Sequence, residues 1–154
     1  MIRFIYGDDD AIRDFIAQRE GLPRGLFAEG KGIGIVNERN EFLAGFFYHH
    51  WNPEAGTIVM SGTALSTRWM SRSVLKRLFD YPFYECKCQM LMIQLRASDE
   101  RMKRQLAVGG FGFTTIARLY GRGEDGIIAT MYEEDWRASK FNKTARTALL
   151  EEAA

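Results

Sequence analysis

Residues 56–80 read GTIVMSGTALSTRWMSRSVLKRLFD, and this stretch decides the fold that the sequence predicts. Its first half, from Thr57 to Leu65, is rich in the β-branched and apolar residues that are typical of a strand. A short polar loop, residues 66–73, leads directly into an amphipathic helix. One face of that helix repeats apolar side chains at helical spacing, namely Val74, Leu75, Leu78 and Phe79.

This loop has the properties of an anion site. The first-turn N–H groups of a helix have no partner inside it, and the helix dipole makes that end positive. Arg68 and Arg72 add full positive charges beside it. The loop therefore predicts a site for a phosphate-bearing ligand; the alternative is an ordinary helix start with solvated arginines.

The bulk composition fits one globular domain. The chain has 154 residues, of which 46% are hydrophobic and 27% charged. The formal net charge of +1 disfavours nucleic-acid binding, which depends on many phosphate contacts. No apolar run approaches the roughly 20 residues of a membrane span. Two cysteines, Cys86 and Cys88, fall in a segment that looks like a strand and make no disulfide framework, so we expect a reducing, cytoplasmic setting.

The rest of the chain predicts a mixed α/β sheet. We expect a strand at 2–6, a helix from Asp8 to Gly21, an irregular piece at 22–30 that is a short helix or a substrate rim, and a hairpin over 31–50. Tyr81-Pro82-Phe83 ends the central helix, a strand covers 86–95, a helix capped by Ser98 follows, and two strands cover 113–120 and 126–132. The helix after the fourth strand predicts strands four and five as parallel neighbours whose carboxyl ends leave a crevice. This single domain covers 1–132, and 133–154 is a polar tail compatible with a helix.

This order of elements resembles the GCN5-related N-acetyltransferase superfamily, over about residues 2–132. The family's pyrophosphate loop reads Gln/Arg-x-x-Gly-x-Gly/Ala, and the corresponding stretch is Arg68-Trp69-Met70-Ser71-Arg72-Ser73, with serines in place of both glycines. The family's second motif, Asn followed later by Gly-Phe, is represented by Ser98 and Gly110-Phe111. Many members carry a tyrosine four residues before that glycine as general acid, but Leu106 stands there.

The resemblance implies a sheet of six to seven mostly antiparallel strands with a splayed parallel pair, flanked by helices, and acetyl-CoA as co-substrate. The pantetheine arm would pair with the main chain around Ala64 and Leu65. The N–H groups of 70–74, including that of Val74, would hold the pyrophosphate. Ser98, and Arg101 or Arg104, would lie near the adenosine phosphate.

The resemblance implies direct transfer of an acetyl group to a primary amine of a protein or small molecule. Base candidates are His49, His50 and Glu54, and acid candidates are Tyr120 and Tyr132. We expect no metal site, because the spacing of the histidines and cysteines fits no zinc pattern and adjacent strand histidines point to opposite faces.

A second interpretation is a non-catalytic binding or structural protein with this fold, for example a phage or prophage component. The lost glycines and Leu106 favour it, whereas Arg68 and the open helix start favour an enzyme. The acceptor amine is not encoded in any motif, and a homodimer is compatible with the sequence.

Overall fold

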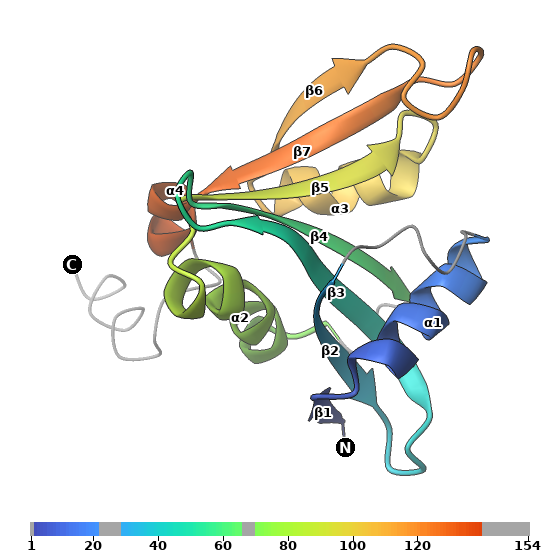
Figure 1. The fold of residues 1–154 in the computed structure, drawn as a ribbon, viewed down its shortest axis with the longest axis vertical. Helices are drawn as coiled ribbons and strands as arrows, with labels where there is room; N and C mark the ends of the chain where they lie inside the picture. Colours follow the sequence, from blue (N-terminus) through green and yellow to red (C-terminus); the bar gives the residue numbers. More distant parts are fainter. Residues whose placement is uncertain (1, 22–28, 66–69, 140–154) are drawn as a thin grey trace.

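The computed structural model describes residues 2–21, 29–65 and 70–139 (Figure 1). The predicted rim at 22–28 and the loop residues Arg68 and Trp69 lie outside these ranges. The elements follow in the order β1 (Arg3–Tyr6), α1 (Asp9–Glu20), β2 (Gly30–Val36), β3 (Phe42–Asn52), β4 (Thr57–Ala64), α2 (Arg72–Asp80), the π-helical turn η2 (Tyr81–Glu85), β5 (Met90–Arg96), α3 (Glu100–Val108), β6 (Gly112–Ile116), β7 (Gly126–Tyr132) and α4 (Glu133–Ala138).

These strands form one seven-stranded mixed sheet in the order β1-β2-β3-β4-β5-β7-β6. Every neighbouring pair is antiparallel except β4 and β5, which are parallel. The predicted fold class and the predicted parallel pair are therefore confirmed. The reason is the crossover through α2, because a strand that returns through a helix to its neighbour runs in the same direction.

The parallel pair is paired over only part of its length. Its register joins Thr57 to Met90, Ile58 to Leu91 and Val59 to Met92, and goes no further. Beyond that point β4 continues to Ala64 beside β3, while β5 continues beside β7. The two halves of the sheet therefore separate, as Figure 1 shows for the arrow ends of β4 and β5.

Helix α1 covers one face of the β2–β3 half of the sheet. Asp9 and Asp10 occupy its first turn, and it ends at Gly21, whose φ of 65° is the left-handed conformation common after helices. Ile12 and Ile16 are buried against Phe47. Glycines in the sheet permit this close approach, since a Cβ on Gly32 would lie 2.9 Å from Ile12 Cδ1. Gly45 allows a close approach of the same kind, with Phe15 Cδ1 3.0 Å from where a Cβ would be.

The larger core lies on the other face. Phe46 and Tyr48 belong to it, as expected from the alternation of strand side chains around Phe47. Residues of α2, η2, α3 and α4 complete it, among them Leu78, Phe83, Leu106 and Trp136. Trp136 is fully buried, with its ring centroid 4.9 Å from that of Phe79. The first six residues of the predicted polar tail thus form α4, and its tryptophan is part of the core.

The central α-helix ends at Asp80, as predicted, but Tyr81-Pro82-Phe83 do not leave helical structure as the sequence suggested. The chain stays helical through η2, with the Cys86 N–H donating to the Tyr81 carbonyl at 2.9 Å. Pro82 is tolerated because it sits at the start of this turn, where its missing N–H has the least consequence. Lys87 then takes a positive φ of 56° before β5 begins. Cys86 and Cys88 therefore precede the strand in which they were predicted, and both are free thiols.

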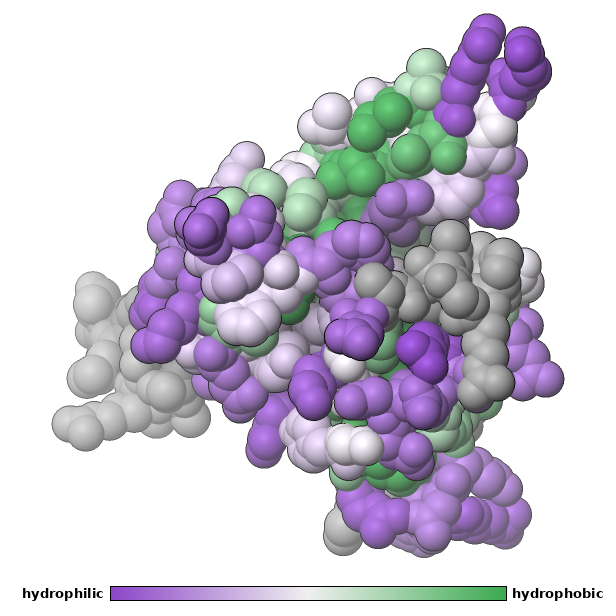
Figure 2. Space-filling view, in the orientation of Figure 1, coloured by the Kyte–Doolittle hydropathy of each residue, from purple (hydrophilic) through white to green (hydrophobic). Residues whose placement is uncertain are grey.

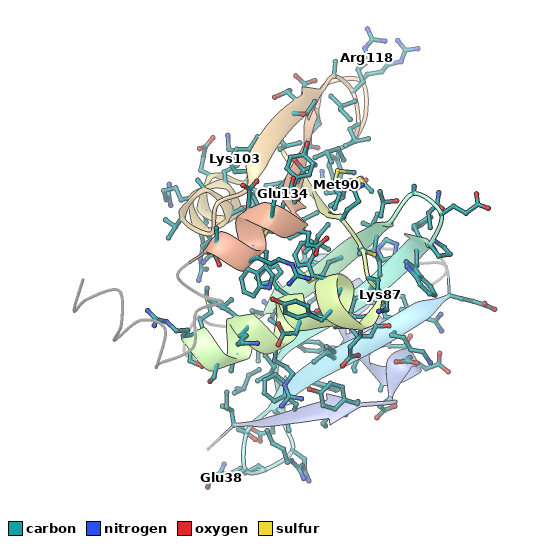
Figure 3. All side chains as sticks on the ribbon, turned by 90° about the vertical axis from the view of Figure 1, so that its left-hand side faces the viewer. Glu38, Lys87, Met90, Lys103, Arg118 and Glu134 are labelled. Atoms are coloured by element: carbon teal, nitrogen blue, oxygen red, sulfur yellow. The ribbon has the colours of Figure 1, made fainter. Side chains whose placement is uncertain are left out.

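Two further boundaries differ from prediction. Helix α3 is capped by Asp99, whose Oδ1 accepts from the Met102 N–H at 3.1 Å, and not by Ser98. Strand β6 ends at Ile116 instead of 120, since Arg118 adopts a φ of 63° and its N–H donates to Asp125 Oδ1. The loop from there to β7 projects away from the molecule, and Figure 3 shows Arg118 near its tip.

Candidate functional site

The separated ends of β4 and β5 define an opening in the sheet. Helix α2 starts after the carboxyl end of β4, and α3 starts after the carboxyl end of β5. Ligands of open α/β sheets bind at such carboxyl ends, where neighbouring connections lead to opposite sides. We refer to this gap between Met60–Ala64 and Ile93–Arg96 as the strand opening.

Two N–H groups at the start of α2 precede the first bond within the helix. The first bond within the helix runs from the Leu75 N–H to the Ser71 carbonyl at 2.9 Å, so the N–H groups of Arg72 and Ser73 precede it. The Val74 N–H, by contrast, donates to Ser71 Oγ at 3.2 Å. Of the N–H groups of 70–74 that were predicted to hold a pyrophosphate, that of Val74 is therefore already used, because it donates to the serine hydroxyl. The side chains of Met70 and Arg72 are exposed.

The main chain of β4 presents one edge to the opening. Leu65 uses its N–H to reach the Leu43 carbonyl at 2.9 Å, on the β3 side, and Ala64 is in register with Ala44. On the other side, pairing with β5 stops at Val59. An extended ligand can therefore add along Met60 to Ala64 as a strand adds to a sheet edge.

The predicted contacts on α3 lie on its surface. Ser98, Arg101 and Arg104 are all exposed at the start of this helix or within it. Leu106 is 9% exposed and belongs to the core. The helix therefore places no acid at the position where the resembling family carries its tyrosine.

The acid and base candidates separate into those near the opening and those far from it. His49 is in register with Val59, the last residue of β4 that pairs with β5. Glu54 lies exposed in the turn between β3 and β4. Tyr132 is in register with Met90, at the closed end of β5. The expectation that His49 and His50 point to opposite faces is wrong, because their rings lie 4.8 Å apart. The cause is the left-handed φ of 52° at His50, where β3 bulges.

Tyr120 lies over the open part of β5. It forms a side-chain hydrogen bond with Gln94 and lies under the Arg96 guanidinium, 4.6 Å from its ring centroid. Arg96 is in turn bound to Glu124 at 2.7 Å. Burial raises the pKa of Tyr120, while Gln94 and Arg96 partly oppose this. The phenol is therefore protonated at neutral pH and able to donate a proton.

A polar group on α1 and β4 faces this tyrosine across the opening. The Thr63 hydroxyl donates to Glu20 Oε1 at 2.6 Å, and Arg19 Nε approaches the same hydroxyl at 3.3 Å. The Glu20 carboxylate is close enough to Tyr120 to raise its pKa. Sequence reasoning missed Glu20, Thr63 and Gln94. The available signal was the alternation of Ser61 and Thr63 in an otherwise apolar strand, which puts two hydroxyls on one face.

Apolar side chains also lie beside the strand opening, on the half of the sheet that contains β5. Figure 2 shows hydrophobic side chains gathered over the half of the sheet formed by β5, β7 and β6. Met92 and Ile128 are partly exposed there, and Ile116 is 39% exposed. The β5 side of the opening thus carries apolar side chains as well as Gln94, Arg96 and Tyr120, whereas β4 and α1 contribute the polar groups described above.

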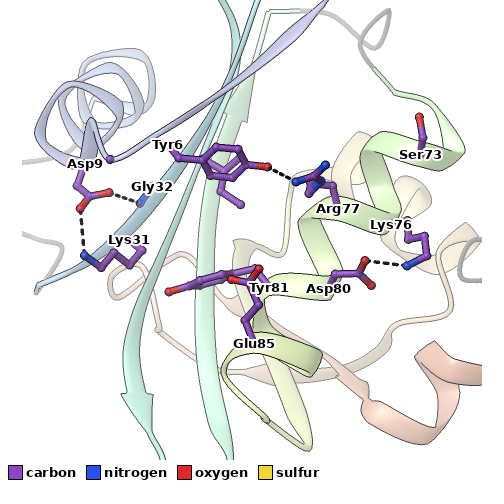
Figure 4. Close-up of a pocket in the computed structure, with 12 residues that line it drawn as sticks. Tyr6, Asp9, Lys31, Gly32, Ser73, Lys76, Arg77, Asp80, Tyr81 and Glu85 are labelled. Atoms are coloured by element: carbon purple, nitrogen blue, oxygen red, sulfur yellow. Dashed lines mark hydrogen bonds and ion pairs between the residues drawn. The ribbon is translucent and has the colours of Figure 1, made fainter.

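A second hollow, of about 730 Å³, lies between β1, β2 and the outer side of α2 (Figure 4). Its charges largely pair among themselves. Asp9 binds Lys31 at 3.8 Å, Asp80 binds Lys76 at 2.7 Å, and Arg77 donates to the Tyr6 hydroxyl at 3.1 Å. It therefore presents little unpaired charge to a ligand.

Membrane spans and metal clusters are both absent from the described part of the chain. Within ranges 2–21, 29–65 and 70–139, no helix is long and apolar enough to cross a membrane. Among the same residues, no three or more histidine, cysteine, aspartate or glutamate side chains are grouped so as to hold a metal ion.

The architecture is the fold of the GCN5-related N-acetyltransferases, as solved structures show. Mutant forms of the spermidine/spermine N-acetyltransferase SpeG from Vibrio cholerae match with a TM-score of 0.68 at 10% identity, covering 90% of this chain and 100% of theirs. Another mutant of the spermidine N-acetyltransferase SpeG from Vibrio cholerae matches at 0.70 with 8% identity, covering 89% and 96%. The dodecameric structure of that organism's enzyme in an intermediate state matches at 0.69 with 8% identity, covering 90% and 98%.

At 8–10% identity this likeness establishes the fold alone. No family model and no curated protein matches the sequence. The three structures named above are of enzymes from Vibrio cholerae and give no support to a phage origin.

Proposed function

We propose that the chain is an acetyl-CoA-dependent N-acetyltransferase that moves an acetyl group directly to a primary amine of a protein or small molecule. The observation that carries the proposal is the end of β4–β5 pairing at Val59 and Met92, with the start of α2 at the open end. From Met60 to Ala64 the main chain is not paired with β5, and the N–H groups of Arg72 and Ser73 precede the first bond within α2, which suits a ligand that is extended at one end and anionic at the other.

The residues present fit this ligand in part. The edge from Met60 to Ala64 would hold the pantetheine arm, with Leu65 at its end. The N–H groups of Arg72 and Ser73, with the Arg72 charge, would hold the pyrophosphate; Met70, Ser71 and Val74 would flank it, beside Arg68 and Trp69. Ser98, Arg101 and Arg104 would approach the adenosine end from α3. The thioester supplies the activated acetyl group, and the protein's task is to align it with the amine and move protons.

Tyr120 is the proposed general acid. Its phenol is protonated at neutral pH and lies over β5, so it can donate to a sulfur leaving through the opening. Glu20, on the opposite side, would attract a cationic amine. Among the other candidates, Glu54 is the least suited, because it is exposed in a turn beyond the closed end of the pair.

A second function is that of a non-catalytic binding or structural protein with this fold. Two observations favour it. Ser71 Oγ caps the Val74 N–H where the resembling family keeps a glycine and an open donor. Leu106 is buried in place of the usual tyrosine.

Thermal unfolding with acetyl-CoA and a thiol-release assay separate the two functions. A ligand that binds only the native state stabilises it, by about 2.7 kcal/mol at a ligand concentration of 100 times the Kd, and therefore raises the melting temperature. We expect millimolar acetyl-CoA to raise it, and free thiol to appear with at least one amine in a panel of polyamines, aminoglycosides and lysine peptides. Stabilisation without thiol release supports the second function. A melting temperature that acetyl-CoA leaves unchanged overturns the acetyltransferase and the cofactor with it, and leaves only the structural form of the second function.

Arg72→Ala tests the anion site. Loss of one charge-assisted contact should weaken acetyl-CoA binding about tenfold, with unchanged thermal unfolding of the free protein. Arg39→Ala is the matched control, because Arg39 lies exposed in the turn between β2 and β3. Equal affinities of the two variants for acetyl-CoA would show that the start of α2 is not part of the binding site.

A further inference from the structure

A bulge in β3 brings two histidine rings into contact. The register of β3 with β4 shifts between His49 and Asn52, and His50 adopts a φ of 52°. Residues with a Cβ pay an energetic cost in this left-handed region, so the surrounding structure must hold the conformation in place. As a result the Nδ1 atoms of His49 and His50 lie 2.5 Å apart.

The other nitrogen of the His49 ring reaches β4. His49 Nε2 lies 2.8 Å from Ser61 Oγ. Ser61 is two residues beyond Val59, where pairing with β5 ends, so its hydroxyl lies at the side of the strand opening. The three side chains therefore form a continuous hydrogen-bonded chain in the order Ser61, His49, His50.

The two ends of this chain differ in their exposure. His49 is 7% exposed, whereas His50 is exposed to solvent. His49 also lines a hollow of about 510 Å³ that runs around the start of β2. The charged and titratable groups that line this hollow are Asp9, Asp10, Arg13, Glu29, Lys31, Tyr48, Tyr81 and Cys86. A proton that reaches His50 or this hollow can thus pass to water.

The neutral state of the His49 ring suits the transfer of a proton along this chain of side chains. Burial, and then the neighbouring His50, lower the pKa of His49 to about 4. Its ring is therefore neutral at physiological pH, with one nitrogen that donates and one that accepts. A neutral imidazole held between two partners can take a proton on one side and release another on the opposite side.

We propose that Ser61, His49 and His50 form a proton relay that carries the proton of the attacking amine from the strand opening to solvent. The inference rests on the proposed acetyl transfer. As the bond between the amine nitrogen and the acetyl carbon forms and the carbon–sulfur bond breaks, the nitrogen gives a proton to Ser61 Oγ. The Ser61 hydroxyl proton moves to His49 Nε2, the His49 Nδ1 proton moves to His50 Nδ1, and His50 releases its Nε2 proton to water. The sulfur takes its proton from Tyr120, so all charges balance.

In this assignment Ser61 contacts the substrate, and the two histidines act through it. The left-handed conformation at His50 then has a purpose, because an extended residue at that position would turn its ring to the other face of the sheet.

The coupling of the three side chains is measured first, by long-range proton–nitrogen NMR of the free protein. We expect Ser61→Ala to change the ring-nitrogen shifts of His49 and the titration of His50, while Thr114→Ala, which removes an exposed hydroxyl from β6, changes neither. Unaltered His50 titration in Ser61→Ala would show that the chain is not coupled and would overturn the relay.

The pH dependence of thiol release tests the role in transfer. We expect Ser61→Ala and His50→Gln each to lower kcat at pH 7 by about a hundredfold, at the lower end of the range of general acid–base catalysis, with little change in the KM for acetyl-CoA. The loss should shrink toward pH 9.5, where hydroxide can take the proton. Ser61→Thr keeps the hydroxyl and should recover most of the rate.

The possible results separate the relay from the proposed function. A wild-type protein that turns over, with variants that match it at pH 7 or that lose the same factor at every pH, overturns the relay and leaves the acetyltransferase standing. A wild-type protein that releases no thiol with any amine overturns the proposed function and the relay with it.

Discussion

The Tyr48 hydroxyl donates a 2.6 Å hydrogen bond to the main-chain carbonyl of Leu78 inside the core. The carbonyl of Leu78 would ordinarily accept from the residue four positions later, but that residue is Pro82, which has no N–H. A tyrosine on β3 thus supplies a donor that the helix lacks, and it ties the sheet to the junction of α2 and η2.

Replacing this tyrosine should therefore destabilise the fold. We expect Tyr48→Phe to lower the free energy of unfolding by about 1–3 kcal/mol, because it leaves a buried carbonyl without its donor. Urea denaturation measures the change. Tyr132→Phe, at a 43% exposed position, is the control and should stay within about 0.5 kcal/mol of wild type. Equal losses in both variants would contradict the role of the bond.

Alkaline pH should weaken the protein through the same residue. Burial, followed by the nearby Tyr81 and Tyr6, raises the pKa of Tyr48 well above its ordinary value. The unfolded chain loses this proton near pH 10 and the folded chain does not, so the associated stability is complete below pH 10 and falls as pH rises further. We expect unfolding free energy measured from pH 8 to pH 11 to fall less steeply in Tyr48→Phe than in wild type.

Acidic pH should act through His49. Its pKa of about 4 lies below the ordinary 6.5, so the unfolded chain binds more protons between these values. The contribution of His49 is complete above about pH 6.5 and is lost as pH falls toward 4. Between pH 7 and pH 4.5 we expect the free energy of unfolding to fall by about 2 kcal/mol more in wild type than in His49→Gln. Parallel losses in urea melts at the two pH values would show that His49 is not buried as a neutral ring.

The role of α4 in the core can be tested at Trp136. The ring is fully buried against Phe79 and Phe83. We expect Trp136→Ala to cost about 3–5 kcal/mol, with a smaller loss for Trp136→Phe. Arg137→Ala changes the neighbouring residue, whose side chain is 53% exposed, and should have little effect. Calorimetric melting temperatures that do not distinguish the tryptophan variant from this control would exclude α4 from the core.

The fold was largely predictable because it follows from hydrophobic periodicity and from one crossover. The two strand-like segments on either side of the turn at residues 37–40, and the helix after β4, were sufficient to predict the hairpin and the parallel pair. The errors came where a distant partner decides the local structure. Tyr48 and the core around Phe83 hold the chain helical past Pro82, and nothing local to residues 81–85 signals this.

The site was less predictable for the same reason. The positive start of α2 is a local pattern, so the sequence alone is enough to propose Arg72 and Ser73 as anion contacts. Glu20, Thr63 and Tyr120 come together only through the tertiary arrangement of α1, β4 and the β6–β7 loop. The contact between His49 and His50 depends on one left-handed backbone angle, which a regular strand pattern does not contain.

The register between β4 and β5 has a mechanical consequence. Among the described residues, the four-stranded and three-stranded parts of the sheet are joined by three residue pairs, Thr57–Val59 against Met90–Met92, and by the Gly56 carbonyl, which accepts from the N–H groups of Gln89 and Met90. A ligand bound along Met60 to Ala64 would extend the main-chain hydrogen bonding between these two parts of the sheet. The two parts would then move together as one rigid body. Amide hydrogens of Met60 to Ala64 would then exchange more slowly with ligand than without it.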